Sequence, residues 1–228
     1  MQLFKDIFDL FFPEVCLACK NQLYSNESSI CTFCRHDFPQ TDFTNVSNNQ
    51  LEKLFHGRSP IKEATALFYF HKKGKVQELI HQLKYRNHQE IGEVLGYWLG
   101  EDLKSSNRFK SIDYIVPVPI HPKKRRKRGY NQLTKFGEAL AQTLSKTLIE
   151  NELQKIDSTE TQTRKGKMER WLNVQNHFEI KDLSFFENCH VLLIDDVITT
   201  GATLEACSNQ FLKCKNATVS IAVIAYTE

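Results

Sequence analysis

The stretch Val191–Thr203, VLLIDDVITTGAT, constrains the fold more than any other part of this 228-residue chain. It begins with an apolar run, Val191–Ile194, which is typical of a strand covered on both faces in a parallel sheet. Two adjacent carboxylates, Asp195 and Asp196, end this run, and a Thr/Gly loop leads into helical spacing over 203–212. The order of strand, acidic pair, small-residue loop and helix predicts one unit of an α/β fold.

The rest of the chain continues this alternation of strands and helices. Apolar runs predict strands over 64–70, 112–118 and 217–226, and helical spacing predicts helices over 76–83, 88–104 and 133–148. The second of these helices carries Gly92, Gly96 and Gly100 at four-residue intervals, which predicts a smooth face for close packing. Alternating strands and helices indicate a mostly parallel sheet flanked by helices.

We expect two parts in this chain. Residues 1–60 would form an N-terminal module, with an amphipathic helix, a cysteine-rich knuckle pair, and a polar linker over 37–60 that has few core-forming positions. Residues 61–228 would form the α/β domain, with 157–170 as a polar surface excursion. No apolar run approaches the ~20 residues that span a bilayer, and charges interrupt the N-terminal apolar stretch. We therefore expect a cytoplasmic protein without a membrane span.

Four of the seven cysteines form two Cys-x-x-Cys pairs, Cys16 with Cys19 and Cys31 with Cys34. Four thiolates complete the tetrahedral shell of Zn²⁺, so this spacing predicts a closed, structural zinc site. Two disulfides or a thioredoxin-like redox pair are the alternatives. They fit less well, because disulfides are rare in the cytoplasm and neither pair follows a βαβ pattern. No pattern assigns a role to the remaining three cysteines: Cys189, Cys207 and Cys214.

The acidic pair and the loop after it form the predicted ligand site. Ligands of open α/β sheets bind at the carboxyl edge of the strands, and loop N–H groups at a helix start hold a phosphate. Asp195 and Asp196 are placed to accept bonds from sugar hydroxyls, or to hold them through Mg²⁺. The alternative is a pair that only ends a strand and caps a turn. Adjacent carboxylates repel each other, however, so a cation or a donor is expected beside them.

A second candidate site lies in residues 117–132, PVPIHPKKRRKRGYNQ, which follow a predicted strand. Lys123–Arg128 is a run of six basic residues that cannot be buried, so it faces either solvent or an anion. Arg side chains bind phosphate oxygens in bidentate fashion, which favours a flexible loop that closes over a pyrophosphate group. A nucleic-acid-binding patch is the alternative, although the net charge of the chain is only +3.

Five motifs, in this order, resemble those of bacterial ComF-type proteins. They are the two Cys-x-x-Cys pairs, Leu83-Lys84-Tyr85, PVPIHPKKRRKRGYNQ, the pattern Gln162-Thr163…Arg170…Asn173-Val174…Phe178, and LIDDVITTGAT. The resemblance runs from about residue 16 to the end of the chain, and 37–60 has no match to it. It implies a type I phosphoribosyltransferase fold. It also implies a link to natural competence and transformation, DNA uptake, and the handling of incoming single-stranded DNA in the cytoplasm.

The resemblance also implies a ligand and the residues that bind it. The ligand is phosphoribosyl pyrophosphate (PRPP), whose ribose hydroxyls and Mg²⁺ would meet Asp195 and Asp196. The residues implied for its 5′-phosphate are Thr199, Thr200, Gly201, Ala202 and Thr203. The candidates for the pyrophosphate and the flexible loop are Lys84, Arg125, Arg128, Gly129 and Asn131. The implied cofactors are Mg²⁺ and structural Zn²⁺.

Two functions of different classes follow from these predictions. An active protein would be a phosphoribosyltransferase that moves the phosphoribosyl group to an acceptor that the sequence does not identify. A catalytically silent protein would be a PRPP sensor, or a module that binds DNA or other competence and DNA-processing proteins. Glutamine-dependent amine transfer by this chain alone is disfavoured, because the N-terminal cysteines are taken up by the predicted knuckles.

Overall fold

The computed structural model describes residues 13–121, 126, 129–156 and 178–228. Three predicted features lie outside these ranges: the N-terminal helix, most of the basic run over 123–128, and the polar pattern between Gln162 and Val174. Arg126 is the one residue of the basic run that is described, and it is exposed.

Five parallel strands form the central sheet, in the order β1-β7-β6-β2-β3. Their bounds are Ala64–Tyr69 for β1, Tyr114–Pro117 for β2, Thr147–Leu148 for β3, His190–Ile198 for β6 and Thr218–Tyr226 for β7. Strands β6 and β7 are long runs of buried apolar residues, as expected where helices cover both faces of a sheet. This architecture confirms the predicted, mostly parallel α/β fold.

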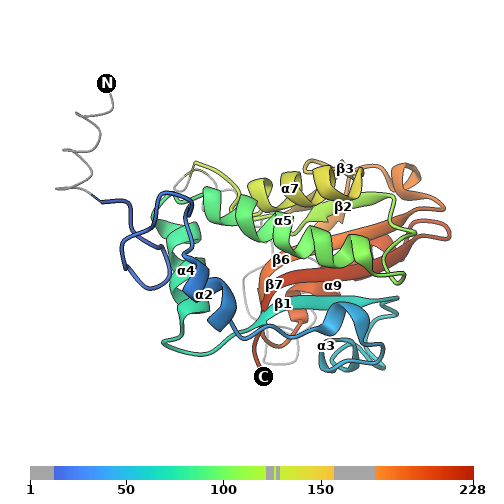
Figure 1. The fold of residues 1–228 in the computed structure, drawn as a ribbon. Coiled ribbons are helices and arrows are strands. Elements are labelled where there is room, and N and C mark those ends of the chain that lie inside the picture. Colours follow the sequence, from blue (N-terminus) through green and yellow to red (C-terminus); the bar gives the residue numbers. More distant parts are fainter. Residues whose placement is uncertain (1–12, 122–125, 127–128, 157–177) are drawn as a thin grey trace, which may run out of the picture.

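The helices lie on both faces of the sheet. Helices α5 (Glu90–Ser105) and α7 (Thr134–Leu144) lie on one face, and α9 (Ala202–Phe211) lies on the other (Figure 1). The crossover from β2 through α7 leads outward to β3, whereas the crossover from β6 through α9 leads the opposite way, to β7. Right-handed crossovers that run in opposite directions place their helices on opposite faces. The topological switch point therefore lies between β2 and β6, which is where open α/β sheets bind ligands.

Strand β6 is longer than the sequence predicts. The prediction ended the strand at Ile194, but β6 continues to residue 198 because β7 offers ladder partners along this whole stretch. On its other side β6 loses its partner after Ile194, where Pro117 and Pro119 lack the N–H groups that would extend β2. The acidic pair therefore lies within β6, at the open edge left by β2.

The glycines of α5 form the close-packed face that their spacing predicts. A Cβ atom at Gly96 would lie 2.5 Å from the carbonyl oxygen of Phe136 and 2.7 Å from the Cβ of Ala139, both in α7. At Gly100 it would lie 2.8 Å from the Cβ of Thr143. These separations are too short for real carbon atoms, so α5 and α7 approach this closely only because α5 has no side chains there.

Helix α7 ends earlier than predicted. Apolar spacing predicted a helix as far as Leu148, but α7 stops at Leu144 because Ser145 takes a left-handed conformation with a φ of 54°. Leu148 instead lies in β3, where its side chain covers Gly137 of α7. An apolar residue at the right interval fits either element, so periodicity alone could not detect the boundary.

The segment over 37–60 is not a linker. It contains a 3-10 turn, η1 (Phe43–Asn45), and a short helix, α3 (Gln50–Lys53). Its buried large apolar side chains are Phe38, Phe43, Leu51 and Phe55. The prediction of few core-forming positions is wrong. The core residues are scattered through a polar segment, and the helical spacing of Leu51, Leu54 and Phe55 covers only one turn, which is too short to predict an element.

This segment covers the outer edge of the sheet. The ring centroid of Phe38 lies 4.9 Å from that of Phe68 in β1, and the Asn49 side-chain amide donates to the Ala64 carbonyl over 2.8 Å. Edge strands need such cover because they expose unpaired backbone groups. The division of the chain into a module of 1–60 and a domain of 61–228 stays a prediction.

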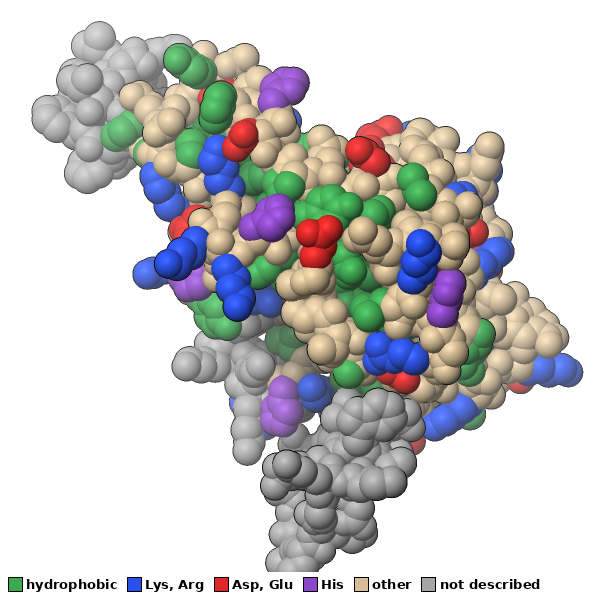
Figure 2. Space-filling view, turned by 90° about the horizontal axis from the view of Figure 1, so that it is seen from below, with side chains coloured by type: hydrophobic (Ala, Val, Ile, Leu, Met, Phe, Trp, Pro, Cys, Tyr) green, Lys and Arg blue, Asp and Glu red, His purple; other side chains and the backbone are tan. Residues whose placement is uncertain are grey.

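Smaller elements surround this core. They are α2 (Thr32–Asp37), α4 (Lys75–Tyr85), the antiparallel ribbon of β4 (Leu153–Lys155) and β5 (Phe178–Ile180), and the 3-10 turn η2 (Leu183–Phe186). Seen from below, Lys and Arg side chains lie on both the left and the right of this face, and hydrophobic side chains are exposed among polar ones nearer its middle (Figure 2). Within the described ranges, no helix has the length and apolar character needed to cross a membrane.

Candidate functional site

The acidic pair of β6 has a cation and an amide donor beside it. The Nζ atom of Lys84, at the end of α4, lies 2.7 Å from Asp196 Oδ1, and the Gln132 amide donates to Asp196 Oδ2 over 2.7 Å. The Asp196 side chain is only 6% exposed, so these two partners compensate a buried charge. The expectation that a cation or a donor lies beside the pair is confirmed.

Asp195 points to the other face of β6. Successive side chains of a strand alternate between faces, so Asp195 lies toward α9 whereas Asp196 lies toward α4 and α7. Burial and the neighbouring charge of Asp196 raise the pKa of Asp195 to about 8, although the Asp196 N–H donates to its Oδ1 atom over 2.8 Å. A carboxyl group with so high a pKa keeps its proton at neutral pH until a cation or a donor comes beside it.

The loop after β6 forms a small hollow next to Asp195. Among the described residues, those that line this hollow are Asp195 and 197–204. Gly201 has a φ of +74°, which L side chains rarely adopt, and α9 begins at the next residue. The three threonines of the loop are exposed. A carboxyl group, exposed hydroxyls and the N-terminus of a ten-residue helix therefore share one hollow, an arrangement suited to a phosphorylated sugar.

The other residues predicted for the pyrophosphate are only partly described. Arg125 and Arg128 lie outside the described ranges. Gly129 is exposed, with a φ of +84°, and the Asn131 side chain accepts a bond from the Leu133 N–H over 3.1 Å in the turn before α7. Lys84, in contrast, lies at the centre of the site, paired with the acidic residue of β6.

Two residues of this region were missed by sequence reasoning. Gln132, the partner of Asp196, directly follows the predicted Asn131 in PVPIHPKKRRKRGYNQ, so the motif itself held the signal. Arg58 had no such signal. Its Nη1 atom donates to the Thr200 carbonyl over 2.9 Å, and only the fold brings these distant parts of the chain together.

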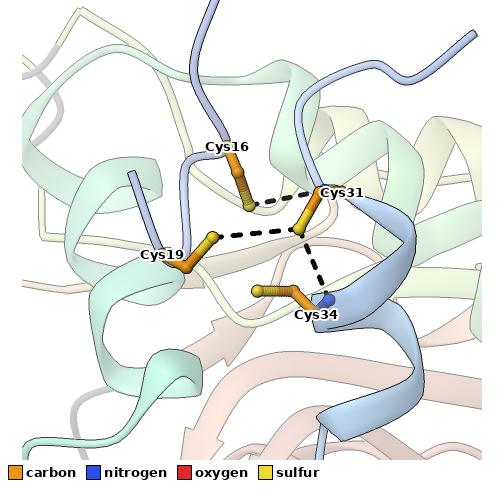
Figure 3. Close-up of side chains that lie close together, drawn as sticks. All are labelled: Cys16, Cys19, Cys31 and Cys34. Atoms are coloured by element: carbon orange, nitrogen blue, oxygen red, sulfur yellow. Dashed lines mark hydrogen bonds between the residues drawn. The ribbon is translucent and has the colours of Figure 1, made fainter. Parts of the chain in front are cut away.

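The four predicted zinc ligands lie together (Figure 3). The Sγ atoms of Cys16, Cys19, Cys31 and Cys34 are all within 4.8 Å of one another, and those of Cys19 and Cys31 are 3.8 Å apart. A tetrahedral shell with Zn–S bonds of about 2.3 Å has S···S edges of about 3.8 Å, so the spacing fits Zn²⁺. All four are free thiols, which fits a metal site and not the alternative of two disulfides.

The surroundings of the sulfurs also suit a cation. Burial raises the pKa of Cys16, but N–H groups of Cys31, Cys19 and Ala18 outweigh this effect and lower the pKa to about 7. Burial and the neighbouring thiols raise the pKa of Cys34. Four adjacent thiols cannot all ionise alone, whereas a metal ion would stabilise all four thiolates. The cluster can therefore hold a metal ion in a closed, structural site.

The fold and the sheet-edge site together define the class of protein. A parallel sheet flanked by helices carries an acidic pair and a small-residue loop at its switch point, and a four-cysteine module precedes it. This is the predicted type I phosphoribosyltransferase fold with a small N-terminal module.

Sequence relatives then confirm the resemblance to ComF-type proteins. The chain is 26% identical over 212 residues to Competence protein F of Haemophilus influenzae, covering 89% of this chain and 93% of that protein. It is 26% identical over 208 residues to Competence protein ComFC of Bacillus subtilis, covering 91% and 82%. It is also 27% identical over 146 residues to the DNA utilization protein YhgH of Escherichia coli K12, covering 63% of each. No family model matches the chain.

Solved structures of adenine phosphoribosyltransferases are similar to this chain at a low level. The enzyme of Saccharomyces cerevisiae is 18% identical with a TM-score of 0.37, over 63% of this chain and 72% of that one. The enzyme of Leishmania tarentolae is 13% identical with a TM-score of 0.40, over 83% and 94%. TM-scores of this size carry no weight by themselves, and the strand order of the sheet is what defines the fold.

Proposed function

We propose that this protein binds PRPP at the carboxyl edge of its sheet. The observation that carries the proposal is the shared hollow, which Asp195, the Thr/Gly loop and the start of α9 face together. A carboxyl group suits sugar hydroxyls, and a helix N-terminus suits a phosphate. These two groups lie one short loop apart, as the two ends of a ribose 5-phosphate require.

In this proposal the loop over 199–203 holds the 5′-phosphate through its backbone N–H groups and the positive end of α9. Gly201 supplies the left-handed conformation, with a φ of +74°, through which this loop enters α9. Asp195 accepts bonds from the ribose hydroxyls. Such bonds stabilise the charged form of a carboxyl group whose pKa is otherwise raised, so binding would release a proton.

The pyrophosphate would lie on the opposite side of β6. Lys84 is 24% exposed, so its ammonium group can reach an anion from its position beside Asp196. The residues proposed to act with it are those of the predicted flexible loop: Arg125, Arg128, Gly129 and Asn131. Asp195 and Asp196 are the residues proposed for Mg²⁺, whose chemistry is to neutralise charge on pyrophosphate. Because they lie on opposite faces of β6, Asp196, beside Lys84, is the one that would meet the ion on the pyrophosphate side.

The cellular role we propose is competence-linked handling of incoming single-stranded DNA in the cytoplasm. The names of the relatives, two competence proteins and a DNA utilization protein, support it. Phe33 is 69% exposed, and the Lys75 Nζ atom lies 4.9 Å from its ring centroid. Exposed aromatic rings beside cations are what surfaces that bind single strands use.

Turnover distinguishes the two versions of this function. In an active phosphoribosyltransferase, the bond between the anomeric carbon and pyrophosphate breaks, and positive charge develops on the ribose ring. The carboxylate of Asp195 would stabilise that charge, while Lys84 and the basic loop stabilise the leaving group. In the alternative, the same site binds PRPP without turnover, and the protein acts as a PRPP sensor or as a DNA- or protein-binding module.

Calorimetry of the purified protein with PRPP and Mg²⁺, followed by an assay for released pyrophosphate, tests this proposal. Binding with release would identify an enzyme, and binding without release would favour the sensor. Absence of binding would contradict the proposal. DNA binding is tested separately with a salt series, because contacts between basic side chains and phosphates predict an affinity that falls steeply as salt rises.

A further inference from the structure

The guanidinium of Arg58 connects the segment over 37–60 to the proposed phosphate loop. Its Nη1 atom donates to the Thr200 carbonyl over 2.9 Å and to the Leu54 carbonyl over 3.2 Å. Its Nε atom donates to Glu205 Oε2 over 3.1 Å, and its Nη2 atom donates to the same oxygen. One side chain therefore holds a loop carbonyl, a helix carboxylate and its own segment at once.

The bond to Thr200 fixes the orientation of a peptide group in the loop. In a trans peptide the C=O and the following N–H point in opposite directions, so holding the Thr200 carbonyl turns the Gly201 N–H away from Arg58. Thr200 and Gly201 are among the described residues that line the hollow, which are Asp195 and 197–204, whereas Arg58 is not, so the guanidinium holds this peptide from outside the hollow. Arg58 thus acts on the hollow through the peptide that precedes α9.

The ion pair with Glu205 removes an electrostatic obstacle to anion binding. Glu205 lies in the first turn of α9, and its side chain is only 10% exposed. An unpaired carboxylate there would repel a phosphate at the helix N-terminus. Because the Arg58 guanidinium neutralises it, the positive end of α9 stays available to an anion.

The side chains of Leu54 and Phe55 support the same loop. A Cβ atom at Gly201 would lie 3.2 Å from Leu54 Cδ2 and 3.3 Å from Phe55 Cζ, so these side chains form a wall against the loop backbone. The Ser59 hydroxyl donates to Asn209 Oδ1 over 3.2 Å, which attaches the segment further along α9.

We infer that Arg58 is a positioning residue of the 5′-phosphate site: it orients the Thr200–Gly201 peptide toward the phosphate and neutralises Glu205 behind it. This inference rests on the proposed function, because it assigns Arg58 to the phosphate end of the ligand in that site. Arg58, with Leu54 and Phe55, then acts on the proposed phosphate loop, so this part of the chain is not only a cover for the sheet edge.

The test compares Arg58→Gln, the double variant R58Q/E205Q and the control Ser59→Ala, each as the full-length, zinc-loaded chain. Calorimetry measures the affinity for PRPP with Mg²⁺, for ribose 5-phosphate and for pyrophosphate with Mg²⁺. We expect R58Q to bind PRPP and ribose 5-phosphate about tenfold more weakly, as loss of a charge-assisted bond predicts. The double variant should be only about threefold weaker, because it leaves no unpaired carboxylate near the phosphate.

Pyrophosphate affinity should stay unchanged in all variants, and S59A should bind all three ligands like wild type because it breaks a contact that does not reach the loop. A purely structural role for Arg58 would lower all affinities together and would give no recovery in the double variant. If R58Q does not fold, the double variant, which buries no unpaired charge, replaces it.

Wild-type affinity for ribose 5-phosphate in either variant, or an equal loss for pyrophosphate, would overturn the inference. If the wild-type protein itself bound neither PRPP nor ribose 5-phosphate, the proposed function would fail, and the inference with it. The two failures are therefore distinguishable by the wild-type titration.

Discussion

The four-cysteine cluster and the sheet-edge site are both compact groups of polar side chains, but they are held together in different ways. The cysteines come from two local pairs, and their sulfurs meet within 4.8 Å in one short module. The sheet-edge site takes Lys84 from α4, Gln132 from the turn before α7, and the acidic pair from β6. The first group would gain its cohesion from the proposed metal ion, whereas the second depends on the sheet and on the helices packed around it.

Because the two sites are held together differently, we expect them to tolerate different substitutions. The two regions meet along α4, where Lys20 Nζ lies 3.1 Å from Glu78 Oε1 and Lys75 Nζ lies 2.7 Å from Asp37 Oδ2. Both ion pairs are largely exposed, so they contribute little to stability. Helix α4 is fixed mainly by its buried side chains: Val76, Leu79, Ile80 and Leu83. We therefore expect the two sites to be nearly independent.

The largest expected effect is that of Cys16→Ser on the cysteine cluster. The substitution removes one of four ligands, and structural zinc sites contribute about 10 kcal/mol or more to folding in zinc-finger peptides. We expect loss of bound zinc, measured by metal analysis, and rapid proteolysis of the N-terminal module. PRPP affinity should stay within about threefold of wild type, since a threefold change is under about 1 kcal/mol. A loss of PRPP binding in this variant would show that the two sites are coupled.

The next largest effect concerns the acidic pair. Asp195→Asn with Asp196→Asn should weaken PRPP binding at least about 100-fold, because each lost charge-assisted bond costs about 1.5–3 kcal/mol. Zinc content should not change. Of the two single variants, D195N should lose more affinity for ribose 5-phosphate, since Asp195 is the member of the pair that lines the hollow. Calorimetry that found wild-type affinity in the double variant would refute the ribose assignment.

A smaller effect is expected when Asp196 loses its cation. Lys84→Met removes the ion pair with the buried Asp196 carboxylate and leaves its hydrogen bond with the Gln132 amide. We expect the substitution to lower the free energy of unfolding by about 2 kcal/mol. The matched control is Lys75→Met, which breaks an exposed ion pair with Asp37 and should cost less than about 1 kcal/mol. Urea unfolding measures both, and equal costs would contradict the assignment of a buried charge at the sheet edge.

The smallest effect is a pH dependence carried by Asp195. Burial and the charge of Asp196 raise its pKa from 3.8 to about 8. The folded state therefore holds a proton that the unfolded state has lost between these values, so the free energy of unfolding falls as pH rises through this window. His190, whose pKa burial lowers to about 4, has the opposite effect below its usual value of 6.5.

The comparison that isolates Asp195 is urea unfolding of wild type and D195N at pH 7 and pH 8, a range above the usual pKa of His190. Wild type should lose stability relative to D195N between these two values. An identical stability difference at both would contradict a raised pKa for Asp195.

The sequence predicted what depends on local pattern. The strand that begins at Val191, the loop after it and the two cysteine pairs could be predicted directly. A buried apolar run before an acidic pair is typical of a covered strand, and two close Cys-x-x-Cys pairs favour a metal site over disulfides. The close packing of α5 on α7 was also predictable, since glycines at four-residue intervals leave a bare helix face.

What could not be predicted depends on contacts between distant parts of the chain. The extension of β6 beyond Ile194 requires β7 as a ladder partner, which no local pattern shows. Phe38 and Phe55 lie in a segment of mostly polar residues, and their place in the core depends on β1 and on the loop before α9, which pack against them. Arg58 lies more than 140 residues before Thr200 in the sequence, so only the fold reveals their contact.

The most direct test of the central claim is a crystal structure of the protein with PRPP and Mg²⁺. We expect the 5′-phosphate to lie in the hollow at the start of α9, within hydrogen-bond distance of the N–H groups of 199–203. A ribose hydroxyl should donate a hydrogen bond to Asp195. A 5′-phosphate found elsewhere, with the loop over 199–203 free of ligand, would contradict it.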